Sequence, residues 1–151
     1  MPNTKAVGVA FSDPELVAGT TITGATISGG TVSGATSVSA GDITTTGGLY
    51  LKSATVAAAG TNQATAAAVS DGFTLVSAAD GTKGVLLPAA VAGRTVILKN
   101  NANAVLKVWP ASGDAVNAIA ADSNYVLAAY TSSLLVAYDS TTWYSVPLLA
   151  S

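Results

Sequence analysis

A period of five residues constrains this chain more than any other feature of its sequence. Residues 21–35 read TITGATISGGTVSGA, which is one unit written three times: Thr, a β-branched residue, Thr or Ser, Gly and a small residue. A helix repeats every 3.6 residues or so and a strand about every two, so a repeat of five gives neither element a lasting apolar face. The segment therefore fits neither an ordinary helix nor an ordinary strand.

The apolar positions of this repeat need a surface outside the segment. Solenoids built on five-residue units use about four units for each coil, and several coils must stack before a core is buried. The three units present make less than one coil, so they cannot cover their own apolar residues. The surface is supplied either by copies of the chain wound about a shared axis or by a separate partner; the alternative is a disordered low-complexity arm. The regular β-branched positions favour assembly and the glycines permit close backbone approach, so the predicted assembly interface consists of Ile22, Ile27, Val32, Gly24, Gly29 and Gly34.

Beyond residue 70 the sequence alternates short apolar runs with turn signals. Val, Ile and Thr are abundant, whereas only 9% of the residues are charged, a balance that favours strands over helices. Short runs of this kind, bounded by Gly, Pro, Asn and Asp clusters, predict an antiparallel β-sandwich or barrel. The eight expected strands are residues 73–78, 84–87, 95–99, 105–109, 116–119, 125–129, 134–138 and 143–146.

The chain thus divides into an arm and a domain. We predict an all-β protein with an extended N-terminal repeat arm at residues 1–54 and a C-terminal β-domain at residues 55–151. The β-domain begins with an Ala-rich connector within the stretch ATVAAAGTNQATAAAVS, residues 54–70. It reads either as a helix, because Ala is the best helix former, or as an extended path, because Thr, Val and Gly interrupt it.

Two of the expected strands show a clear period of two. Val96 and Leu98 alternate with Thr95, Ile97 and Lys99, and Leu106 and Val108 alternate with their own neighbours in the sequence VLKVW. Successive side chains of a strand point to opposite faces of its sheet. The sequence therefore predicts that Val96, Leu98, Leu106 and Val108 face the core.

The composition excludes most familiar chemistry. The chain has neither Cys nor His, which removes disulfides, thiolate nucleophiles, the usual zinc sites and imidazole bases. Its net charge is −2, so we expect no nucleic acid as a partner, because phosphate binding needs clustered Lys and Arg. No apolar run has the length and character of a membrane span, and the N-terminus does not resemble a signal peptide. We expect no membrane partner.

Catalysis by this chain would depend on a pair of carboxylates, as in glycoside hydrolysis. Asp114 and Asp122 form the closest acidic pair within the predicted β-domain. Each lies in a turn sequence, SGDA or ADSN, where Asp commonly accepts hydrogen bonds from nearby backbone amides. We therefore predict a non-enzymatic protein with no cofactor and no metal site.

Several short motifs resemble those of a known class of proteins. GVLLPAAVAGRTVILKN at residues 84–100 and LKVWPASGDAVN at residues 106–117, together with TNQATA upstream and TTWYSV downstream, resemble a block in small virion proteins of tailed bacteriophages. TISGGTVSGAT at residues 26–36 is similar to arms of phage fibre and head-decoration proteins. The resemblance covers residues 61–146 and carries no catalytic residues.

The resemblance implies a structural role in the virion. It implies a homotrimeric head decoration protein or head fibre, bound to the major capsid protein or another virion protein through the N-terminal arm. Such a protein is assembled in the host cytoplasm and is located on the outer surface of the capsid. The resemblance leaves the choice between head and tail open.

An alternative function is a tail-associated module that binds a receptor or a carbohydrate. Sugars stack on exposed aromatic rings and bond to Asp and Asn side chains. The other interpretation of the same aromatic residues is packing in the core and between subunits. The candidate ligand surface, with a glycan as its ligand, consists of Trp109, Asp114, Asn117, Trp143 and Tyr144.

Overall fold

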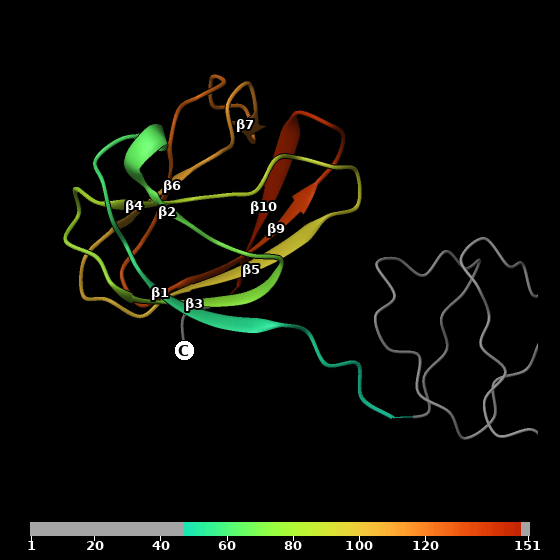
Figure 1. Ribbon diagram of the computed structural model, residues 1–151, viewed down its shortest axis with the longest axis horizontal. Coiled ribbons are helices and arrows are strands. Elements are labelled where there is room, and N and C mark those ends of the chain that lie inside the picture. Colours follow the sequence, from blue (N-terminus) through green and yellow to red (C-terminus); the bar gives the residue numbers. More distant parts are fainter. Residues whose placement is uncertain (1–46, 149–151) are drawn as a thin grey trace, which may run out of the picture. The chain divides into compact units, whose positions relative to one another are not determined.

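The computed structural model describes residues 47–148, which lie within a compact unit spanning residues 45–151 (Figure 1). The predicted all-β class is confirmed, because the described residues form strands and a single 3-10 turn, η1. Their bounds are β1 Ser53–Ala57, η1 Gln63–Thr65, β2 Ala67–Ala68, β3 Gly72–Ala78, β4 Gly84–Leu86, β5 Thr95–Asn100, β6 Leu106–Trp109, β7 Ala115–Val116, β8 Tyr125–Leu127, β9 Ser132–Ala137 and β10 Thr142–Leu148.

The strands make two sheets with the core between them. Sheet A has six strands in the order β1-β3-β5-β9-β10-β7, and sheet B has four in the order β2-β4-β6-β8. Consecutive strands from β1 to β6 alternate between the sheets, so the chain crosses from one layer to the other at every connection (Figure 1). Because of this alternation, strands that follow one another in the chain lie in opposite sheets, and neighbouring strands of one sheet are far apart in the sequence.

The first six strands wind like a short solenoid. In sheet A, Ser53 pairs with Phe73 and Phe73 with Ile97, both in parallel, at steps of 20 and 24 residues. In sheet B, β2, β4 and β6 are likewise parallel. The predicted antiparallel sandwich or barrel is therefore wrong for this part of the domain. Local alternation of apolar residues defines a strand but carries no information on which distant strand it pairs with.

The last strands reverse the winding direction. β8 is antiparallel to β6, and β9 is antiparallel to both β5 and β10. Here the antiparallel prediction holds, while β7 adds a short parallel pair to the far side of β10. The stack of coils is closed at this end by strands that run against it.

The core is built from the inner faces of both sheets. The four side chains predicted to face it, Val96, Leu98, Leu106 and Val108, are all fully buried, which confirms that prediction. Trp143 of β10 is the largest buried side chain, with no exposed surface. Small and β-branched side chains fill most of the remaining space between the sheets.

All eight expected strands have counterparts in β3 to β10, whereas β1 and β2 were not among them. The Ala-rich stretch follows the extended alternative for the most part, since β1 and β2 lie at its two ends. Between them, Asn62 caps the short η1 turn by accepting a hydrogen bond from Thr65 N at 3.1 Å. Of the described part of the chain, no helix has the length and apolar character needed to cross a membrane.

Candidate functional site

The predicted assembly interface lies outside the described residues. Ile22, Ile27 and Val32, with Gly24, Gly29 and Gly34, all precede residue 47. The interface and the division of the chain at residue 54 stay predictions. β1 begins at Ser53, so the described strand runs across the boundary drawn from the sequence.

Trp109 ends β6 on the outer face of sheet B, opposite to the buried Val108. Its indole lies against Gly84: a Cβ added at Gly84 would lie 2.9 Å from Trp109 Cδ1 and Nε1 and 2.6 Å from Lys107 O. The ring is partly covered, and its Nε1 has no hydrogen-bond acceptor within the described residues. Close packing between β4 and β6 thus requires glycine at position 84.

The two carboxylates weighed as a catalytic pair tie loops together. Asp114 is 4% exposed, and its Oδ2 accepts a hydrogen bond from Ala90 N at 2.8 Å. Asp122 Oδ1 accepts from Gly113 N at 2.8 Å and from Gln63 Nε2 at 3.0 Å. Gly113 first and Gln63 second lower the pKa of Asp122 below its ordinary value. The predicted bonding to nearby amides of their own turns is wrong, because each carboxylate accepts from another segment of the chain.

Asn117 connects a turn to β10. Its backbone has φ of 55°, and its Oδ1 accepts from Ser145 N at 2.9 Å while its Nδ2 donates to Ser145 Oγ at 2.8 Å. Its backbone N–H donates to Trp143 O at 2.7 Å. Because both ends of the amide are used, the side chain holds β10 in place.

Trp143 and Tyr144 point to opposite faces of β10. Trp143 is fully buried, so its ring belongs to the core and offers no stacking face to a sugar. Tyr144 is 50% exposed and meets the ring of Tyr138 edge-on, with centroids 5.9 Å apart. Of the five residues proposed as a ligand surface, Tyr144 alone is exposed. Trp143 therefore packs in the core, which is the alternative interpretation of the aromatic residues. Asp114 and Asn117 use their side chains in hydrogen bonds within the domain.

The sequence analysis predicted no role for Asn100, a core residue whose side chain makes four hydrogen bonds. It is fully buried at the end of β5, and its Nδ2 donates to Ala104 O and Ala128 O at 2.9 Å and to Leu127 O at 3.3 Å. Its Oδ1 accepts from Ala102 N at 3.1 Å. The sequence did contain a signal for this role. Asn100 lies on the same side of its strand as the predicted core residues Val96 and Leu98.

Two Asp turns of the same form join strands at the surface. Asp80 Oδ1 accepts from Thr82 N at 2.9 Å, Thr82 Oγ1 at 2.7 Å and Lys83 N at 3.0 Å. The Thr82 hydroxyl, followed by the two backbone amides, lowers the pKa of Asp80 far below its ordinary value. Asp139 accepts in the same way from Thr141 and Thr142, and the Thr141 amide is the main cause of its lowered pKa.

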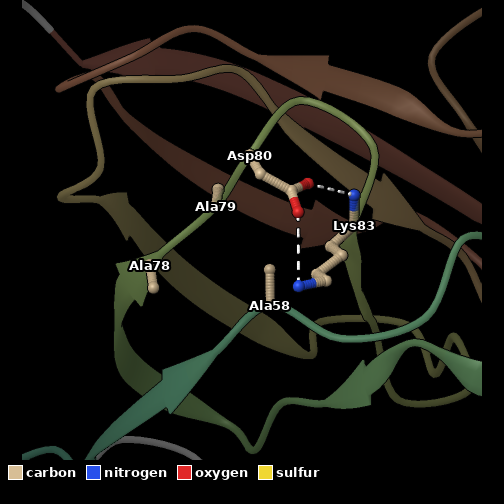
Figure 2. Close-up of a pocket in the computed structure, with 5 residues that line it drawn as sticks. All are labelled: Ala58, Ala78, Ala79, Asp80 and Lys83. Atoms are coloured by element: carbon tan, nitrogen blue, oxygen red, sulfur yellow. Dashed lines mark hydrogen bonds and ion pairs between the residues drawn. The ribbon is translucent and has the colours of Figure 1, made fainter.

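The Asp80 turn borders a small hollow of about 120 Å³ (Figure 2). Ala58, Ala78 and Ala79 supply its apolar walls, and the Lys83 ammonium lies 3.3 Å from Asp80 Oδ2. Figure 2 shows Asp80 directed at Lys83, both at the backbone N–H and at the end of the side chain. An ion pair satisfied within one turn leaves neither group directed at a ligand.

The described residues contain no group of three or more side chains suited to hold a metal ion. Comparison with protein-family profiles, curated proteins and solved structures finds no match to this chain. The described domain has a packed core and turns whose carboxylates are already hydrogen-bonded. The surfaces that remain for binding are the outer faces of its two sheets.

Proposed function

We propose that this chain is a non-enzymatic structural protein of a tailed-phage virion, a homotrimeric head decoration protein or head fibre. In this proposal the N-terminal arm binds the major capsid protein or another virion protein, and the β-domain projects from the outer surface of the capsid. The motifs at residues 84–117 and the arm sequence at residues 26–36 support it by resemblance.

One observation of the domain carries the proposal. At one end of the coil stack the chain continues into antiparallel strands, with β7 and β8 at the sheet edges, and at the other end β1 and β2 are the edge strands. The chain enters at the β1 end through Leu49, Tyr50 and Leu51, whose exposed fractions are 74%, 93% and 53%. Three large apolar side chains in a row outside a packed domain need cover from another surface. A domain built in this way is suited to attachment through its N-terminal end.

The experiment compares charges at two sets of positions in the repeat. In one full-length variant Ile22→Asp, Ile27→Asp and Val32→Asp place charges at the apolar positions. In the matched control Thr23→Asp, Ser28→Asp and Ser33→Asp place the same charges at the adjacent polar positions.

Sedimentation of each protein with undecorated phage heads measures binding. We expect the first variant to lose binding and the control to retain it, because only the first set needs apolar cover. Equal binding by the two variants, or a wild-type protein that never binds heads, would exclude attachment by the arm. Deletion of residues 1–40 gives a second test: it leaves every described strand intact and should abolish binding.

A further inference from the structure

The outer face of sheet A carries a row of apolar side chains across four strands. The strand registers place Phe73 beside Ile97, Ile97 beside Leu134, and Leu134 beside Val146, which makes one continuous row across four strands. Val136 and Tyr144 pair next to this row. Eight apolar residues lie on the outer face of sheet A: Phe73, Leu75, Ile97, Leu134, Val136, Tyr144, Val146 and Leu148. The polar residues Thr95, Lys99 and Ser132 lie on the same face.

Four of these eight apolar side chains are exposed and the other four are half-buried. Phe73 is 36% exposed, Val146 48%, Tyr144 50% and Leu148 41%. A shallow depression of about 320 Å³ lies at the β1 side of the face, lined in part by Phe73 and Leu75. Monomeric soluble proteins rarely leave an apolar patch larger than a few hundred Å² uncovered. The outer face of sheet A is therefore an interaction surface.

Its size matches one stable interface. Strands about 4.8 Å apart and about 20 Å long give the five strands from β1 to β10 a face on the order of 500 Å² in projection. A surface of protruding side chains has a larger accessible area than its projection. A standard protein interface buries about 800 Å² on each partner. The face can thus supply most of one such interface.

The charges indicate which partner covers it. Lys99 is the sole charged residue on the strands of sheet A, and its Nζ already donates to Tyr130 O at 2.7 Å. The other charged groups of the described domain lie on sheet B or in connections, as Asp80 and Asp139 do. Lys99 pairs with Leu75 and so lies on this face, with its ammonium bound to a backbone carbonyl. A face with a single charge carries no pattern that selects a charged partner.

We infer that the outer face of sheet A is covered by a second copy of this chain. The inference rests on the homotrimer of the proposed function, for which it names the contact surface. Three such faces around a common axis form a triangular prism with the row from Phe73 to Val146 inside. The exposed segment of Leu49 to Leu51 leads into β1, which continues the same sheet.

The test uses the full chain and two matched variants. Val146→Lys charges the outer face of sheet A, and Val126→Lys charges the outer face of sheet B, where Val126 is 51% exposed against 48% for Val146. Light scattering during dilution gives the molar mass and the subunit dissociation constant of each protein. We expect Val146→Lys to raise the dissociation constant by at least about tenfold, because a lysine would be placed in an apolar contact, and Val126→Lys to leave it unchanged.

Each other outcome overturns the inference. A wild-type monomer at every concentration would do so, as would an assembly that both variants weaken equally or neither weakens. A monomer whose binding to phage heads is lost in Val146→Lys would assign the face to the capsid shell; such a result leaves arm attachment to be judged by the charged repeat variants. Circular dichroism checks that Val146→Lys is folded, and Tyr144→Lys replaces it if it is not.

Discussion

The two ends of the coil stack are finished in different ways. At the C-terminal end, β8 covers β6 and β9 covers β5, so the last parallel strands are paired on both sides. At the N-terminal end, β1 and β2 each have one partner and lie at the sheet edges. Open edges pair readily with other chains, and repeat folds need a cap at each end. β7 and β8 are edge strands as well, so the two ends differ in strand direction: the winding reverses at the C-terminal end and runs unreversed to β1 and β2 at the other.

The largest expected effect concerns the side chain that fills the closed end. Trp143→Ala removes a fully buried ring from β10 and should lower the free energy of unfolding by about 3–5 kcal/mol. Urea denaturation followed by far-UV circular dichroism measures the loss. The control is Tyr50→Ala, because the Tyr50 side chain at the open end is 93% exposed and its loss should change stability little. Equal losses would show that the ends do not differ in packing.

Asn100 should give the next largest effect, at the junction between the parallel coils and the closing strands. Its amide bonds to both the β5–β6 connection and the segment before β9. Ala128 O keeps its bonds from Thr131, but Asn100→Leu removes the partner of the buried Ala102 N and that of Ala104 O, which should cost about 3 kcal/mol.

The neighbouring Asn101 provides the matched control. Its side chain is exposed, so Asn101→Leu should be close to neutral in the same denaturation measurement. If Asn100→Leu were equally neutral, the closing strands would be held without this amide. The junction would then depend on apolar contacts.

Gly84 tests the packing of the coils themselves. Gly84→Ala places a Cβ 2.6 Å from Lys107 O, a backbone atom that cannot move without shifting β6. We expect a loss of about 1–3 kcal/mol. Gly48→Ala is the control, because its added Cβ would make ordinary contacts of 3.6 Å with the Tyr50 ring. Differential scanning calorimetry of both variants decides whether β4 and β6 are as closely packed as the structure indicates.

The sequence predicted the strands better than their partners. Alternation at residues 95–99 and 105–109 identified Val96, Leu98, Leu106 and Val108 as core residues, because strand parity is a local property. Parallel pairing of Phe73 with Ile97 joins residues 24 apart, and local patterns do not encode it. β1 was missed because Ala and Ser in SATVA give little apolar contrast between its two faces.

The candidate ligand surface shows the same limit. Trp143 and Tyr144 are adjacent aromatic residues, and composition alone treats them alike. Which one is buried depends on the register of β10 against β9, where Trp143 pairs with the buried Ala137 and Tyr144 with the outward Val136. The turn sequences of Asp114 and Asp122 predicted bonds to nearby amides, but the carboxylates bind Ala90, Gly113 and Gln63 in other segments, and local patterns do not encode such contacts.

The smallest expected effect comes from the two Asp turns, one in each part of the comparison. The Asp80 turn joins β3 to β4 across the layers, and the Asp139 turn joins the β9–β10 hairpin, yet both use one carboxylate oxygen to bind three donors. Asp80→Asn and Asp139→Asn keep that oxygen and remove the charge, so each should lower the melting temperature slightly at neutral pH. Asp80→Asn should show the stronger dependence on salt, because it also removes the ion pair to Lys83.

Acid should reveal the same carboxylates in the wild-type protein. Their folded-state pKa values are depressed, so their stabilising contribution is complete above the ordinary aspartate pKa of about 3.9 and is lost as the pH falls below it. Melting temperatures between pH 7 and pH 2, to be measured by calorimetry, should fall less steeply in the Asn variants than in the wild type. If Asp139→Asn alone flattened the curve, the closing hairpin would be the acid-sensitive part. Equal flattening by both would mean that the two turns contribute alike to the acid sensitivity of the domain.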